Sequence, residues 1–275
     1  MHNRTLKDAV YGLAVADAVG VPYEFRDRGT FCATDMICYG TYNQPAGTWS
    51  DDTSMTIATC YSIRHKGCID TADMLCQFRK WMNKGEFTPH NKTFDIGNTT
   101  AVALRQGFGC SDEYSNGNGS LMRIIPLAFL PDVTEDDIAA VSSVTHAHSV
   151  SVEACILYVK IAKELMTGKS VMESVRKCVA ADSYYKKLRI IDSCPESEIR
   201  SSGYVVDTFE AAIWVLANTD NYRDCVLRAV NLGSDTDTVA AVAGGLAGII
   251  YGFDGIPKKW IKKLCSKDII DSCLF

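Results

Sequence analysis

The stretch Gly233-Ser234-Asp235-Thr236-Asp237-Thr238 opens a helix, predicted over residues 239–252, that is unusually rich in Ala and Gly. A helix that is apolar all round is buried, so we expect this one to lie where other helices approach closely. An earlier run, Trp49-Ser50-Asp51-Asp52-Thr53, likewise gathers carboxylates and hydroxyls at the start of a predicted helix. These two runs predict both the centre of the fold and its functional site.

Helical periodicity extends outward from the two runs along the whole chain. Apolar residues recur at three- and four-residue spacing, and hydroxyl or carboxyl caps and Gly stops mark the boundaries. Further helices are predicted over residues 5–18, 53–66, 71–84, 101–107, 122–130, 134–145, 150–166, 170–181, 207–217, 222–232 and from 257 onward. Segments 25–47 and 182–202 lack a sustained period and are predicted as loops, the second with helical turns. Because no strand pair, repeat or long linker is found, the sequence predicts one all-α domain over residues 1–275.

Composition narrows the classes of function. The chain has 275 residues, 47% of them apolar, which is enough for a large core. A net charge of −5, without a basic patch, argues against a general nucleic-acid or acidic-membrane binder. No apolar run approaches the roughly 20 residues of a membrane-spanning helix, and the N-terminus lacks the layout of a signal peptide. The 12 Cys are scattered without a Cys-x-x-Cys pair, so we expect a reduced, cytoplasmic protein without a zinc site.

The two acidic runs are typical of a site for hard metal ions. Asp51 and Asp52 are adjacent and diverge, whereas Asp235 and Asp237 fall on the same side of an extended segment. Converging carboxylates repel one another unless cations neutralise them, and Mg²⁺ and Mn²⁺ prefer such oxygen ligands. Neutral oxygens are available from nearby hydroxyls, those of Ser50, Thr53 and Thr238. The alternative is that both runs are only helix caps, because Asp, Ser and Thr are the preferred cap residues.

Seven motifs follow one another along the chain. They are Gly12-Leu13-Ala14-Val15-Ala16-Asp17-Ala18-Val19-Gly20 with Pro22 and Glu24, Gly47-Thr48-Trp49-Ser50-Asp51-Asp52-Thr53, Asp95-Ile96-Gly97-Asn98-Thr99-Thr100, Gly117-Asn118-Gly119-Ser120-Leu121-Met122-Arg123, Thr145-His146, Ser202-Gly203-Tyr204-Val205-Val206-Asp207-Thr208 and Asp235-Thr236-Asp237-Thr238. In this order they resemble the motifs of the ADP-ribosylglycohydrolase family, which includes dinitrogenase-reductase-activating glycohydrolases and ADP-ribosyl-acceptor hydrolases. Ala16 and Ser234 depart from the family pattern, since Gly is common at both positions.

The resemblance implies an all-α fold, two Mg²⁺ or Mn²⁺ ions and cleavage of the bond between ADP-ribose and an acceptor. The metal ligands that it implies are Ser50, Asp51, Asp52, Asp235, Asp237 and Thr238. The residues that it places on the substrate are Gly117, Asn118, Gly119 and Ser120 at the pyrophosphate, His146 at the ligand and Tyr204 near the adenine. A Gly-rich turn at a helix start would suit the pyrophosphate through free N–H groups and the helix dipole. Arg123 is open to two interpretations, a phosphate ligand or a packing residue.

The same resemblance implies a hydrolytic mechanism. Asp95 is the first candidate for the base that accepts a proton from water, and Glu24 is the second, with a metal-ligand or gating role as its alternative. The form of the motif around Tyr204 favours ADP-ribosyl-arginine on a protein as the substrate, with ADP-ribose as product. Serine, small acceptors and modified nucleic acid stay open as acceptors. The competing functions are a non-catalytic ADP-ribose-binding member and a metal-dependent phosphoesterase.

Overall fold

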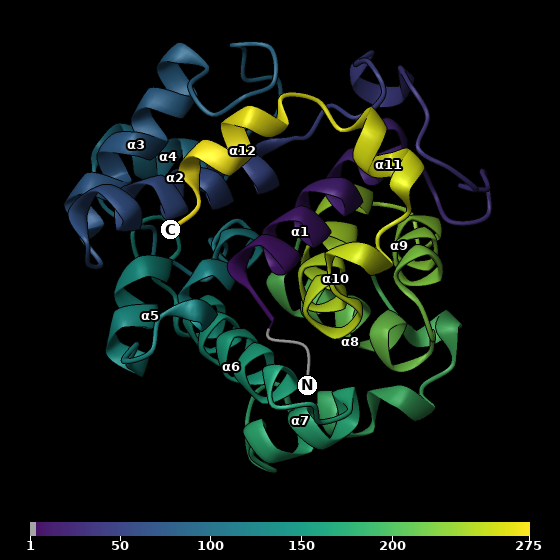
Figure 1. Ribbon diagram of the computed structural model, residues 1–275. Helices are drawn as coiled ribbons and strands as arrows, with labels where there is room; N and C mark the ends of the chain where they lie inside the picture. Colours follow the sequence, from purple (N-terminus) through teal and green to yellow (C-terminus); the bar gives the residue numbers. More distant parts are fainter. Residues whose placement is uncertain (1–3) are drawn as a thin grey trace.

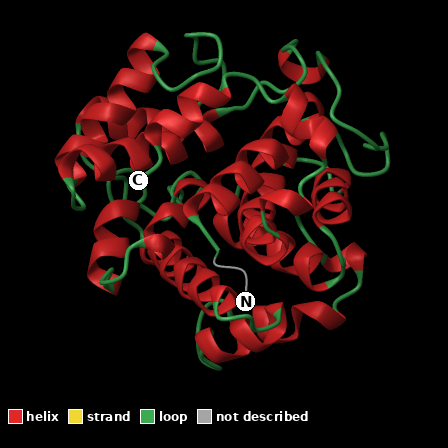
Figure 2. Cartoon of the chain, in the orientation of Figure 1, coloured by secondary structure: helices red, strands yellow, loops and turns green. Residues whose placement is uncertain are grey.

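The computed structural model describes residues 4–275, and within this range every regular element is a helix (Figure 2). The α-helices are α1 (Leu6–Gly20), α2 (Asp51–Lys66), α3 (Thr71–Lys84), α4 (Asn98–Gln106), α5 (Glu135–Ser142), α6 (Ser149–Met166), α7 (Val171–Cys178), α8 (Val205–Ala217), α9 (Tyr222–Asn231), α10 (Thr236–Tyr251), α11 (Lys258–Lys263) and α12 (Lys267–Cys273). The 3₁₀ turns are η1 (Val21–Tyr23), η2 (Gly40–Tyr42), η3 (Leu121–Arg123), η4 (Ile125–Phe129), η5 (Lys186–Ser193), η6 (Glu196–Glu198) and η7 (Phe253–Gly255). The prediction of an all-α fold is confirmed.

Local sequence signals set many of the helix boundaries. Thr5 and Thr134 each form the predicted capping box, with Asp8 and Asp137 as the reciprocal partners. Helix α2 ends where predicted, at Gly67, which adopts the left-handed conformation that glycine tolerates best. Side-chain caps at the start and a left-handed glycine at the end satisfy backbone groups that a helix terminus leaves unpaired.

Helices α1 and α10 form the centre of the molecule and pack against each other more extensively than any other pair (Figure 1). Their backbones almost touch because glycines face each other: a Cβ on Gly12 would lie 2.9 Å from the Gly248 Cα. A Cβ on Gly244 would overlap Ala16, the position at which the family commonly has Gly. The Ala- and Gly-rich helix is therefore buried at a close helix contact, as the sequence predicts.

Three helix termini meet at one place in this arrangement. The C-terminal end of α1 lies against the N-terminus of α10, where a Cβ on Gly20 would lie 2.6 Å from the Asp237 nitrogen. The N-terminus of α2 packs on the same end of α1, through bonds from its first turn to Asp17. As a result, residues near positions 17, 52 and 237 become neighbours.

Three predicted elements differ from the structure. The helix expected over residues 122–130 is replaced by the two short 3₁₀ turns η3 and η4, with Pro126 at the start of the second. The terminal helix is divided into α11 and α12, since Ser266 adopts a left-handed conformation between them. The helix expected after Thr100 begins earlier, at Asn98.

Two further sequence predictions concern the protein's environment. In residues 4–275 no helix has the length and apolar character that crossing a membrane requires. All 12 Cys are free thiols.

Candidate active site

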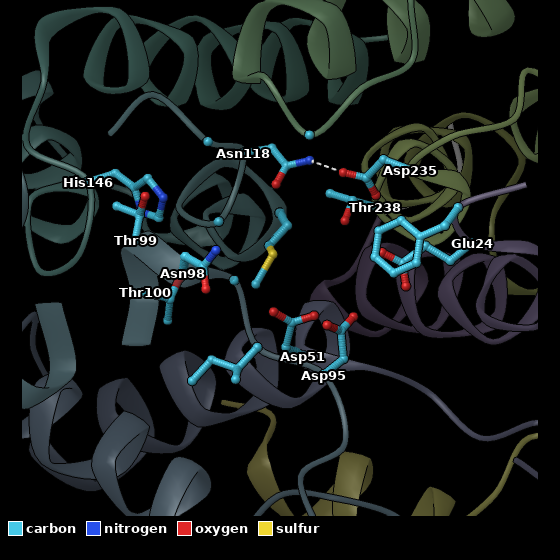
Figure 3. Close-up of a pocket in the computed structure, with 17 residues that line it drawn as sticks. Glu24, Asp51, Asp95, Asn98, Thr99, Thr100, Asn118, His146, Asp235 and Thr238 are labelled. Carbon is cyan, nitrogen blue, oxygen red and sulfur yellow. Dashed lines mark hydrogen bonds between the residues drawn. The ribbon is translucent and has the colours of Figure 1, made fainter. Parts of the chain in front are cut away.

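The starts of α2, α4 and α10, the segment after η1 and the loop 117–119 surround a cavity of about 340 Å³. Its labelled residues separate into two sides in Figure 3. Carboxylates occupy one side, namely Glu24, Asp51, Asp95 and Asp235. The other side carries neutral polar groups, among them Asn98, Thr99, Thr100 and His146. The cavity therefore has an acidic half and a neutral hydrogen-bonding half.

Asp17 fixes the geometry of the acidic half from beneath. Its carboxylate is fully buried and accepts hydrogen bonds from the Ser50 nitrogen at 3.0 Å, the Thr53 nitrogen at 3.1 Å and the Thr53 hydroxyl at 2.5 Å. Burial raises the pKa of Asp17 to about 6, although these hydrogen bonds oppose the shift. The bonds hold the first turn of α2, and hence its two aspartates, against α1.

Carboxylate oxygens gather in two groups next to Asp17. In the first, one oxygen each from Asp17, Asp52 and Asp237 lie within 4.8 Å of one another. In the second, one oxygen each from Glu24, Asp235 and Asp237 do the same. Asp237 belongs to both groups, so the two form one continuous cluster.

Several oxygens of the cluster have no hydrogen-bond donor in the described part of the chain. They are Glu24 Oε2, Asp52 Oδ1, Asp235 Oδ1 and Asp237 Oδ2, all of them buried. Burial raises the pKa of Glu24 to about 8, with the charge of Asp95 as the next cause, and it raises the pKa of Asp52 and Asp237 well above the usual range. Buried acceptors without donors are rare in proteins. Oxygen-only ligands and unpaired carboxylate atoms fit hard divalent cations.

The two hydroxyls predicted as ligands lie beside Asp52. Ser50 Oγ donates to Asp52 Oδ2 at 2.9 Å, and Thr238 Oγ1 donates to the same oxygen at 3.3 Å. Ser50 also caps α2, so the cap interpretation holds for the first run. Asp235, in contrast, makes no side-chain cap bond at α10, so the cap interpretation does not account for the second run.

The remaining acidic residues, Asp51 and Asp95, also line the cavity. Asp51 and Asp95 lie side by side in Figure 3, opposite Asn118 and Asp235. Burial raises the pKa of Asp95 to about 6. For Asp51, burial and then the charge of Asp95 raise the pKa well above the usual range. Asn118 links the two halves, because its side-chain nitrogen donates to Asp235 Oδ2 at 2.8 Å (Figure 3).

The neutral half differs in part from the predicted pyrophosphate site. The Asn118 N–H bonds to the Gly203 carbonyl at 3.0 Å and is not free. The turn that follows, η3, is a single 3₁₀ turn and not the start of an α-helix, so it supplies no helix dipole. Helix α4 fits the predicted physics better: its N-cap, Gly97, has no capping side chain, and its first residues line the cavity.

Three residues that the sequence suggests as substrate contacts are not among those that line the cavity. Ser120 is buried and bonds through its hydroxyl to Ser142. Tyr204 is 37% exposed, and its hydroxyl bonds to that of Tyr184 at 2.8 Å. Arg123 is fully buried and bonds to Thr145 and to the Val141 carbonyl, which favours the packing interpretation over that of a phosphate ligand.

Sequence reasoning assigned no role to two features of the site. In the sequence, Asp17 is a carboxylate among small residues on an apolar helix. Burying a carboxylate costs free energy, so a buried carboxylate at this position indicates a structural or functional role. The start of α4 was visible as Gly97-Asn98-Thr99-Thr100, a helix start whose N-cap lacks a side chain.

Comparison with known proteins agrees with this architecture. The ADP-ribosylglycohydrolase family model matches residues 2–274. The chain is 35% identical to "ADP-ribosylarginine hydrolase Tri1" of Serratia proteamaculans, covering 97% of this chain and 76% of the relative. It is 32% identical to "ADP-ribosyl-[dinitrogen reductase] glycohydrolase" of Rhodospirillum rubrum, covering 97% and 92%. A solved structure, "ADP-ribosylglycohydrolase-related protein complex", superposes with a TM-score of 0.83 at 28% identity and covers 97% of this chain and 94% of that one. With its motifs, helices and acidic cavity in agreement, this chain belongs to the ADP-ribosylglycohydrolase family.

Proposed function

We propose that this protein is a hydrolase that uses two divalent cations, Mg²⁺ or Mn²⁺, to release ADP-ribose from ADP-ribosylated arginine on a protein. The observation that carries the proposal is the pair of oxygen groups that share Asp237, with four buried carboxylate oxygens left unpaired. Each group would hold one ion. Ser50, Asp51 and Thr238 complete the proposed ligand set around Asp52, Asp235 and Asp237, and Asp17 is added by its place in the first group.

The two halves of the cavity suit the two ends of ADP-ribose. The distal ribose, which carries the acceptor, would lie on the acidic half, where bound cations would neutralise the carboxylates and orient the ribose hydroxyls. The pyrophosphate would lie on the neutral half, near the N-terminus of α4 and loop 117–119. Tyr204 would contact the adenine from the rim.

The reaction is hydrolysis of the bond from the anomeric carbon to the acceptor nitrogen. Water attacks the anomeric carbon, its proton passes to a carboxylate, and the bond electrons stay with the guanidino nitrogen, which takes up a proton. Asp95 is our first candidate for the base, since it lies on the cavity wall beside Asp51. Glu24 is the second candidate, with metal binding as its alternative role.

Substitution separates the two candidates for the base. Asp95→Asn and Glu24→Gln preserve shape and remove proton acceptance. Loss of the base should lower kcat by roughly 10²–10⁴-fold while Mg²⁺ binding persists. If both variants keep full turnover with metal bound, neither residue is the base.

Arginine is proposed as the acceptor because two relatives at 35% and 36% identity are described as ADP-ribosylarginine hydrolases. Small ADP-ribosyl compounds would enter the same cavity. The test incubates an ADP-ribosyl-arginine peptide with the protein in Mg²⁺, Mn²⁺ or EDTA and identifies the products by mass spectrometry. Free ADP-ribose that appears only with metal supports the proposal. Binding without turnover would indicate a non-catalytic member, and released phosphate or nucleotide would indicate a phosphoesterase.

A further inference from the structure

Arg123 is a buried cation whose position stability alone does not explain. Its side chain is fully buried in η3, and burial lowers its pKa to about 10. Two of its nitrogens, Nε and Nη1, have no hydrogen-bond partner in residues 4–275. Burying a cation with unpaired donors lowers the stability of the folded protein. The role of Arg123 is therefore to be found in the contacts that its side chain does make.

Those contacts lead toward the cavity through one hydroxyl. The guanidinium lies over the face of Phe78, with Cζ 4.6 Å from the ring centre. Nη2 donates to the Val141 carbonyl at 3.1 Å and to Thr145 Oγ1 at 2.9 Å. Thr145 Oγ1 in turn lies 2.9 Å from Nδ1 of His146. Arg123 therefore reaches the cavity wall by way of Thr145 and His146.

The direction of each hydrogen bond in this chain follows from the chemistry of its groups. A guanidinium can only donate, so Thr145 Oγ1 accepts from Arg123. Thr145 is fully buried, and its hydroxyl hydrogen has one described partner, His146 Nδ1. If Nδ1 carried a hydrogen, the hydroxyl hydrogen would be left unpaired and an N–H would point toward a cation. The favourable arrangement has Thr145 donating to a bare Nδ1, which places the imidazole hydrogen on Nε2.

We propose that Arg123 and Thr145 are positioning residues that hold His146 in its Nε2–H tautomer, so that His146 donates a hydrogen bond into the cavity. The ligand atom at this point must then be a hydrogen-bond acceptor. The identification of that atom as a phosphate oxygen of ADP-ribose rests on the proposed function. The assignment of the tautomer does not.

The surroundings of His146 support this role. Its backbone nitrogen donates to the Ser142 carbonyl, and its own carbonyl accepts from Ser142 Oγ. The imidazole lies against the loop, where a Cβ on Gly119 would lie 2.8 Å from Cε1 and 3.3 Å from Nε2. In Figure 3 the ring lies beside Thr99, across the cavity from Asp51 and Asp95, which suits an anionic ligand group.

The ring also stays neutral, as a single fixed donor requires. Burial lowers the pKa of His146 to about 3, and the positive charge of Arg123 acts in the same direction. Arg123 thus favours both the neutral form and one of its two tautomers.

The test reads the tautomer directly by ¹⁵N NMR of imidazole-labelled protein with Mg²⁺, because a bare ring nitrogen resonates far from a protonated one. The chain has 5 His, so the spectrum of His146→Gln identifies the signals of His146. The wild type should show a bare Nδ1 and a protonated Nε2, unchanged from pH 5 to 8. Thr145→Val keeps the shape but cannot donate, and it should shift His146 toward Nδ1–H. Thr145→Ser should restore the wild-type signals, and Arg123→Met, which removes the cation and its donors, should give a mixture.

Calorimetric titration of ADP-ribose, with Mg²⁺ present, then tests the donated bond. Thr145→Val should weaken binding by about 10- to 100-fold, as expected for a hydrogen bond to a charged group, and Thr145→Ser should bind like the wild type. A bare Nε2 in the wild type, or a tautomer unaffected by Thr145→Val, overturns the inference. So does a changed tautomer with unchanged affinity. If the tautomers behave as expected but the wild type binds no ADP-ribose, the positioning role stands and the proposed function fails.

Discussion

Replacing Asp237 by Asn should stabilise the metal-free protein and remove its response to metal. Burial, and next the charge of Glu24, raise the pKa of Asp237 well above its usual range, so burying this carboxyl opposes folding of the metal-free protein. One of its oxygens, Oδ2, is buried without a hydrogen-bond donor, and such an unpaired polar atom costs about 1–3 kcal/mol of stability. Asn carries no ionisable group, but its amide is still buried. We therefore expect a net gain of about 1–2 kcal/mol, which is roughly 2–8 °C in Tm.

With metal bound, the wild type should become more stable than Asp237→Asn. An ion at 100 times its Kd should stabilise the wild type by about 2.7 kcal/mol. Asp237→Asn should lose most of this gain, since Asp237 belongs to both oxygen groups. Thermal unfolding in EDTA and in a Mg²⁺ or Mn²⁺ series measures both effects, with Asp254→Asn, an exposed carboxylate, as the matched control. A lower metal-free Tm together with an intact metal response would refute the reasoning.

Three further predictions follow from the packing and from His146. Gly248→Ala should destabilise by about 2–3 kcal/mol in urea unfolding, because its Cβ would overlap the Asp8 carbonyl of α1; an unchanged midpoint would contradict the close contact. Gly119→Ala should weaken ADP-ribose binding at least about 10-fold, because the added Cβ would crowd the His146 ring. Gly97→Ala should leave the stability of the protein unchanged, because the added Cβ would lie 3.9 Å from its nearest neighbour, Thr100 Oγ1. His146 gains a proton below pH 6.5 in the unfolded chain but only near pH 3 in the folded protein. The contribution of His146 to the free energy of unfolding is therefore complete above pH 6.5. It falls as the pH is lowered, by about 2 kcal/mol at pH 5. The stability difference between the wild type and His146→Gln, followed against pH, should show this loss.

Local signals in the sequence predict most of the helices, but they do not predict which helices pack against each other. The capping boxes at Thr5 and Thr134 and the stop at Gly67 depend on neighbours within a few residues, and all three are as predicted. The small residues of α10 predicted a close helix contact, but nothing local indicated that α1 would be the partner. The breaks at Pro126 and Ser266 were missed because apolar periodicity continues across both.

The candidate site was predictable to a similar degree. Asp51, Asp52, Asp235 and Asp237 gather oxygens at helix starts, a pattern that is visible locally, and the structure brings their turns together. The position of Asp17 beneath them depends on tertiary contacts to α2. Ser234 shows the same limit. It takes a left-handed φ of 62°, held by backbone bonds with residues 25 and 26, which accommodates Ser where Gly is common.

The pairing of α1 with α10 has a consequence for how this protein is made. The Thr236 hydroxyl bonds to the Gly20 carbonyl, a contact between residues 216 positions apart. During synthesis the ribosome releases α1 long before α10 exists, so the small-residue face of α1 waits without its partner while most of the chain emerges. The carboxylate cluster can form only after that late docking step. Activity should therefore appear only after α10 has been synthesised and has docked, and nascent chains that stop short of α10 should be inactive and should depend on chaperones.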